Sequence, residues 1–77
     1  MTRYRRRKIE EALGYVADAD RILHTCMEEE SDQLDGLPEE DFKGLRGDQM
    51  RGIINMLREI TELLGDAMDY LEEVPEL

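Results

Sequence analysis

The chain has 77 residues, with 20 acidic and 10 basic side chains, one His, one Cys and no Trp, and a formal net charge of −10. A chain of this length forms one domain at most and buries only about 60% of its unfolded surface. We therefore expect a single domain over residues 1–77, with a core that partner chains complete. A hydrophobic content of 40% with six Gly and two Pro excludes a disordered chain or a linker. The lone Cys excludes an internal disulfide, and no apolar run reaches the ~20 residues of a membrane span, so we expect a cytoplasmic protein without a membrane partner.

Apolar residues recur at helical spacing through the first half of the chain. This periodicity predicts one long helix over about residues 5–34. The large members of the stripe and the small ones that accompany them at seven-residue intervals are Ile9, Leu13, Val16, Leu23 and Met27, with Ala12, Ala19 and Cys26.

The connecting segment, residues 35–47, carries signals that end one helix and start another. Gly36 suits the C-cap of the first helix, and Pro38 suits the first position of a new turn, which the acidic residues 39–41 favour. We therefore expect a short helical turn from Pro38 to about Lys43. The apolar residues of this segment, expected to form a plug over the end of the hairpin, are Leu37, Phe42 and Leu45.

A second and stronger heptad pattern follows. We expect a helix over about residues 48–74, capped by Asp48 and stopped at Val74-Pro75, which packs antiparallel to the first. With Met50 at heptad position a, every a and d residue is apolar, which predicts that these two positions form the seam. The a positions are Met50, Leu57, Leu64 and Leu71, and the d positions are Ile53, Ile60, Ala67 and Val74.

Additional apolar residues widen this seam beyond what one helix can cover. Ile54 and Met68 stand at e, and Met56, Leu63 and Tyr70 stand at g. Exposed apolar patches of this size usually mark interaction surfaces. The fold class is therefore all-α: two long antiparallel helices that dimerise into a four-helix bundle, with Leu63 and Tyr70 partly buried between chains.

The N-terminal arm, residues 3–8, holds half of the basic residues. It consists of Arg3, Arg5, Arg6, Arg7 and Lys8, with Tyr4 among them. One interpretation is a phosphate-binding arm whose Tyr4 stacks on a base. The preferred interpretation is a charged helix start whose Arg6 and Arg7 pair with acidic side chains, either within the same helix or at the end of the second helix. The acidic candidates are Glu10, Glu11, Glu72, Glu73 and Glu76.

No constellation of residues supports catalysis, a metal or a cofactor. His24 and Cys26 are two positions apart and face different sides of a helix, so they cannot share a metal ion. The acidic residues of the connecting segment do not have the spacing of a calcium-binding loop. We expect no enzyme activity and no cofactor.

Asp20 stands on the first stripe where an apolar residue is expected. Either it is a seam-edge residue turned toward solvent, or it is buried and paired with Arg51 or Arg58 of the opposing helix, where it would fix register or oligomeric state.

The loop pattern resembles a known group of proteins. Glu28-Glu29-Glu30, Leu37-Pro38-Glu39 and Arg46-Gly47 with Met50, followed by the heptad helix, are similar to small acidic helical-hairpin proteins of phages and prophages. The resemblance covers roughly residues 20–74 and does not include the basic arm. It implies an origin on a mobile element, in a bacterial host cell, and a helical hairpin, but no activity.

These observations favour a non-enzymatic acidic protein-interaction module. Without the arm, the remaining 71 residues carry 20 acidic and five basic side chains, a net of −15, which repels nucleic acid and attracts basic proteins. The sharpest form of this hypothesis is an inhibitor of a host nucleic-acid-binding or defence enzyme through polyanion mimicry. Two alternatives stay open: an oligomer that binds a small phosphorylated ligand or nucleotide through the Arg cluster, and a plain scaffold protein.

Overall fold

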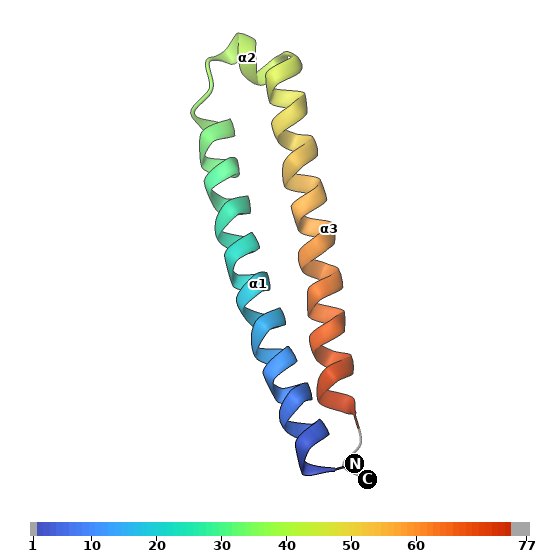
Figure 1. Ribbon diagram of the computed structural model, residues 1–77. Coiled ribbons are helices and arrows are strands. Elements are labelled where there is room, and N and C mark those ends of the chain that lie inside the picture. The colour runs from blue at the N-terminus through green and yellow to red at the C-terminus, as the bar shows by residue number, and fades with distance from the viewer. Residues whose placement is uncertain (1, 75–77) are drawn as a thin grey trace.

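The computed structural model describes residues 2–74 and consists of three helices. α1 (Arg3–Asp35) and α3 (Leu45–Glu73) run antiparallel, and the short α2 (Glu39–Lys43) connects them at one end (Figure 1). The Cα atoms extend over 59 × 14 × 11 Å. The predicted all-helical hairpin with a short helix in its connection is therefore confirmed.

The ends of α1 depend on local capping. The helix begins at Arg3, earlier than the predicted start at about residue 5, because the Thr2 hydroxyl accepts a hydrogen bond from the backbone N–H of Arg5 at 3.2 Å. At the other end Gly36 is the C-cap, as predicted, and its N–H donates to the carbonyl oxygens of Asp32 and Gln33. Its φ of −86° is one that any residue adopts, so the cap does not require glycine.

The start of α3 differs from the prediction. α3 begins at Leu45 with Gly44 as its N-cap, so the assignment of Asp48 as the cap is wrong. The N–H of Asp48 already donates to the Gly44 carbonyl oxygen at 3.2 Å, and its carboxylate accepts from Arg51 at 2.7 Å. The early start is possible because Gly47 has no side chain: a Cβ there would overlap the carbonyl group of Phe42 at the end of α2.

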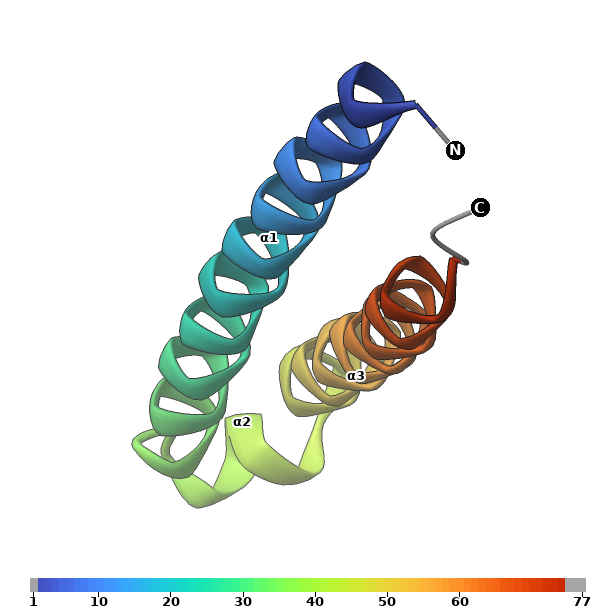
Figure 2. The ribbon, with the colours of Figure 1, turned by 90° about the horizontal axis from the view of Figure 1, so that it is seen from below.

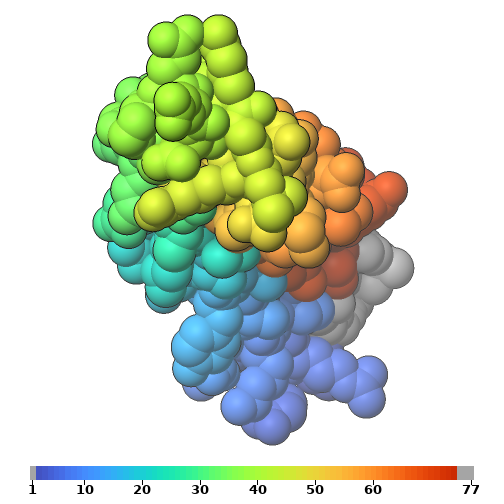
Figure 3. Space-filling model, turned by 90° about the horizontal axis from the view of Figure 1, so that it is seen from above, coloured from blue at the N-terminus to red at the C-terminus, as the bar shows by residue number. Residues whose placement is uncertain are grey.

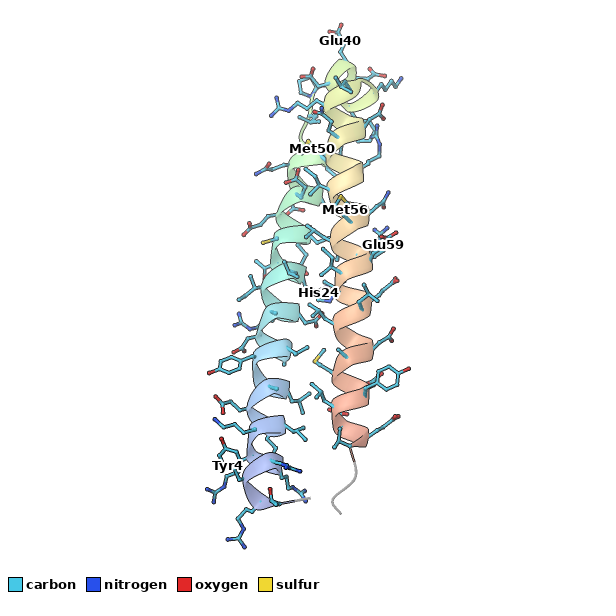
Figure 4. The ribbon with its side chains drawn as sticks, turned by 45° about the vertical axis from the view of Figure 1, so that its right-hand side comes forward. Tyr4, His24, Glu40, Met50, Met56 and Glu59 are labelled. Atoms are coloured by element: carbon cyan, nitrogen blue, oxygen red, sulfur yellow. The ribbon has the colours of Figure 1, made fainter. Side chains whose placement is uncertain are left out.

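The seam between α1 and α3 uses heptad positions a and e of α3. The a residues are buried or half-buried, as predicted, and Met50 points toward α1 whereas Glu59 points away from it (Figure 4). The prediction for position d is wrong for two of its four residues, because Ile53 is 46% and Ile60 41% exposed. Each is replaced in the seam by a neighbour at position e, Ile54 and Thr61 respectively.

The tightest packing lies near the connection. Leu34, Met50 and Ile54 form the buried core, and Met27 and Leu37 pack against it. Farther toward the termini the seam residues are mostly half-buried.

The predicted plug over this end of the hairpin forms only in part. Leu37 packs on the core, but Phe42 is 39% and Leu45 73% exposed, so Leu45 does not belong to the plug. The guanidinium of Arg51 lies over the Phe42 ring, 5.2 Å from its centre, and covers one side of it. Seen from above, α2 and the start of α3 cover the end of the helix pair (Figure 3).

The hairpin is a single layer of helices with large exposed faces. Viewed from the ends of the chain, nothing covers either side of the α1–α3 pair (Figure 2). The accessible surface is 6076 Å² for a 9.0 kDa chain, whereas a compact monomer of that mass exposes about 4,900 Å². The hairpin alone thus exposes roughly 1,200 Å² more than a closed fold would. No helix in residues 2–74 is sufficiently long and apolar to cross a membrane.

Candidate interaction face

The apolar residues left outside the seam form one continuous stripe on each long helix. On both helices each stripe residue directly precedes a seam residue: Tyr15 precedes Val16, for example, and Ile60 precedes Thr61. We call the two stripes together the apolar face. It consists of Ala12, Tyr15, Ala19, Ile22 and Cys26 of α1 and of Ile53, Met56, Ile60, Leu63, Ala67 and Tyr70 of α3.

The two stripes lie on the same side of the hairpin. A step of one residue back along an α-helix rotates the side chain by about 100°. In two antiparallel helices that face each other, the same rotation turns both side chains toward the same side of the pair, as it does for equivalent flanking positions of an antiparallel coiled coil. The hairpin therefore has one apolar side.

The residues predicted to lie between chains belong to this face. Leu63 is 66% and Tyr70 72% exposed in the hairpin, so both are available for a contact with another chain. The a/d assignment did not identify the α1 half of the face. The sequence signal that identifies the α1 half is that, on both helices, each residue of the apolar face directly precedes a seam residue.

The opposite side of the hairpin is polar. The residues that directly follow the seam are mainly polar, and the apolar exceptions, Gly14, Ala17 and Gly65, are small. They are Glu10, Gly14, Ala17, Arg21, His24 and Glu28 of α1 and Arg51, Asn55, Arg58, Glu62, Gly65, Asp69 and Glu72 of α3.

A row of carboxylates runs along the outer edge of α3. The residues are exposed and recur every three or four positions, so they form one line on the helix surface. Within the described residues none of them has an ion-pair partner, and no Lys or Arg follows Arg58 in the sequence. We call this row the acidic edge; it consists of Glu59, Glu62, Asp66, Asp69 and Glu73.

The basic arm is the exposed first part of α1, at the opposite end of the molecule from α2. α1 extends past the end of α3 there (Figure 1), and Figure 4 shows Tyr4 at this end and Glu40 at the other. Arg6 Nε lies 3.4 Å from Glu10, so the predicted pairing within the helix is confirmed for Arg6. Glu11 pairs with Lys8, whose Nζ lies 3.5 Å away, and not with Arg7 as predicted.

The predicted pairing of the arm with the end of α3 is not seen for most of it. In residues 2–74 no ion pair joins Arg3, Arg5, Arg7 or Lys8 to the acidic end of α3. Glu76 and Pro75, which the predictions also involved, lie outside the described residues.

Asp20 is half-buried in the seam, with a side chain that is 22% exposed. Neither predicted arginine reaches it, because Arg51 pairs with Asp48 and Arg58 donates to Asn55. His24, one turn along α1, brings its Nε2 to 3.4 Å from Asp20 Oδ1. This buried oxygen accepts no hydrogen bond from any described residue.

Cys26 and the acidic residues do not form a site of their own. Cys26 is exposed on the apolar face. In the part of the chain that the structure describes, no three His, Cys, Asp or Glu side chains are grouped so that they could hold a metal ion.

Comparison of the chain with protein-family models, with curated proteins and with solved structures returns no match.

Proposed function

We propose that this chain is a non-enzymatic interaction module that dimerises through its apolar face into a four-helix bundle and presents carboxylates to a basic protein partner. The observation that carries the proposal is the segregation of exposed apolar side chains on one side of the hairpin. A monomer with this distribution would keep large residues such as Met56 and Leu63 in water.

The size of the face supports a specific dimer. On α3 it runs from Ile53 to Tyr70, about 26 Å at 1.5 Å per residue, and two adjacent helices make it roughly 20 Å wide. Two such faces in contact bury about 1,000 Å² in total, which is the lower limit for a specific interface. Closure of this face would also remove about 500 Å² per protomer, which is less than half of the surface by which the hairpin exceeds a compact monomer.

The acidic edge supports a basic partner. Its carboxylates follow one another without an intervening cation, and they lie to the side of the apolar face, so dimerisation leaves them accessible. Such a row attracts Lys- and Arg-rich surfaces, and this attraction weakens as salt rises. Occupation of the nucleic-acid channel of an enzyme by this edge is the sharpest form of the proposal.

Sedimentation equilibrium tests the dimer. We expect a mass of about twice 9.0 kDa at tens of micromolar protein, in moderate salt that screens the net charge. Leu63→Glu should shift the mass to that of the monomer, while Glu62→Gln, one position away on the polar side, should remain dimeric. A wild-type monomer under these conditions contradicts the proposal.

Binding to poly-L-lysine tests the acidic edge. Replacement of Glu62, Asp66 and Asp69 by Lys should weaken binding at least tenfold, and the difference should shrink with increasing salt. The matched control replaces Asp18, Glu28 and Asp32 of α1 by Lys, which changes the net charge equally. If both triple variants lose the same affinity, binding reflects net charge alone and the acidic edge is not a site.

A further inference from the structure

The apolar face leaves two ways to add a second copy, and they differ in the relative direction of the hairpins. A two-fold axis between two faces in contact must lie in the plane of the interface. If it runs along the hairpin, the two connections lie at the same end, which we call the aligned arrangement. If it runs across the hairpin, they lie at opposite ends, which we call the reversed arrangement.

We propose that two copies associate in the reversed arrangement, so that the basic arm of each protomer lies against the acidic connection end of the other. This inference rests on the proposed dimer and adds its geometry. It is based on the distribution of charge along the hairpin and on the order of large and small residues in the apolar face.

Charge is distributed unevenly along α1 and the connection. Residues 3–8 hold five basic side chains and no acidic one, whereas residues 28–43, at the connection, hold eight acidic side chains and one lysine. These segments lie at the two extremes of a molecule 59 Å long (Figure 1). The aligned arrangement places the two acidic connections together, whereas the reversed arrangement places the connection of each protomer beside the basic arm of the other.

The basic arm is placed to reach a partner. Because α1 extends past α3, the start of the arm lies beyond the last turn of α3 (Figure 1). Arg5 and Lys8 occupy helical positions that continue the α1 stripe toward the N-terminus, because each lies seven residues before a stripe residue, Ala12 and Tyr15 respectively. Gln33 continues the same stripe at the other end, with Glu29 and Glu30 beside it.

Large and small residues alternate along the α1 stripe, so that α1 can pack on an antiparallel copy of itself. In the reversed arrangement α1 packs on the partner's α1. An axis at the height between Ala19 and Ile22 brings Ala19 opposite the partner's Ile22 and Tyr15 opposite the partner's Cys26, so each large side chain meets a small one. The same axis brings Lys8 opposite the partner's Gln33.

The same axis determines which residues of the α3 stripe meet. Because Leu34 packs beside Met50, residues of α1 and α3 whose numbers sum to about 84 lie at the same height. The axis therefore passes α3 near Leu63, which meets its own copy, and it brings Ile60 opposite the partner's Ala67 and Met56 opposite the partner's Tyr70. The aligned arrangement brings Ile22 to the height of the partner's Leu63, so large side chains meet in both arrangements, and the alternation along α1 is the packing feature that favours the reversed one.

Spin labels measure the arrangement directly. Glu40 lies at the tip of the connection (Figure 4), so Glu40→Cys in a Cys26→Ser background places one label at this end of each protomer. The reversed arrangement predicts an inter-label distance close to the 59 Å length of the hairpin. The aligned arrangement predicts roughly 30 Å or less, the width of a four-helix bundle with two label tethers.

A label at Ala17, exposed near the middle of the polar side, is the control because either arrangement gives it a measurable distance. A short distance at position 40 with a signal at position 17 would overturn the reversed arrangement and leave the dimer intact. A monomeric mass with no dipolar signal at either position would show that the dimer itself is wrong.

Charge reversal provides a second test, because the two arrangements predict opposite effects on the affinity of the dimer. Arg5→Glu with Lys8→Glu should weaken the dimer at least tenfold at low salt if the arrangement is reversed, and Glu29→Lys with Glu30→Lys in the same chain should restore it. Arg21→Glu with Arg58→Glu on the polar side changes the net charge equally and should have a smaller effect. A dimer strengthened by the arm variant would indicate the aligned arrangement.

Discussion

At the residue scale, Gly47 determines how the connection closes. A Cβ at this position would overlap the carbonyl oxygen of Phe42 and lie 2.7 Å from its carbonyl carbon, and neither atom belongs to a flexible side chain. We expect Gly47→Ala to lower the free energy of unfolding by about 1–3 kcal/mol, in the range of overpacked sites. Gly52→Ala, where a Cβ meets nothing within 4 Å, should raise it by about 0.5–1 kcal/mol. Urea denaturation of both variants measures the difference, and equal effects would show that the α2–α3 contact is looser than described.

Asp20 is the second residue that we expect to affect stability by itself, because its buried Oδ1 accepts no hydrogen bond from the described residues. We expect Asp20→Leu to raise the free energy of unfolding by about 1–3 kcal/mol, since the substitution removes the cost of an unsatisfied buried oxygen. Asp18→Leu, two positions away and exposed, should change it by no more than about 0.5 kcal/mol. A destabilised Asp20→Leu would mean that the carboxylate has a partner in the assembled protein, which chemical denaturation at several protein concentrations would reveal.

At the element scale, the a positions of α3 hold the hairpin together. Leu57 and Leu64 face α1, and an aspartate at either site would bury an unpaired charge, at a cost of several kcal/mol against a total stability of about 5–10. We expect Leu57→Asp and Leu64→Asp to abolish the cooperative thermal transition measured by circular dichroism. Asn55→Asp adds the same charge on the exposed side of α3 and should melt like the wild type. A normal transition in either Leu variant would refute the seam.

At the scale of the whole molecule, the stability should depend on protein concentration. The hairpin has a small buried core at one end and half-buried contacts elsewhere, so in the proposed dimer the second copy supplies much of the folding free energy. We expect the melting temperature to fall on dilution, as mass action requires when a dimer dissociates on unfolding. Leu63→Glu should remove this concentration dependence, and Glu62→Gln should keep it. A melting temperature that is constant over a hundredfold dilution would exclude the dimer as the source of stability.

Periodicity, caps and composition in the sequence were sufficient to predict two long helices, a short helix between them and an excess of apolar surface, because these properties depend on neighbours within three or four positions along the chain. The heptad pattern could not decide which apolar positions of α3 face α1, since a, d, e and g are all apolar. Tertiary packing placed Ile54 and Thr61 in the seam and left Ile53 and Ile60 outside. The early start of α3 also required the tertiary structure, because it depends on Gly47 packing against the Phe42 carbonyl, a contact that no local propensity encodes. The two apolar stripes became one face only when the helices were arranged antiparallel, because the same offset from the seam then turns both toward one side.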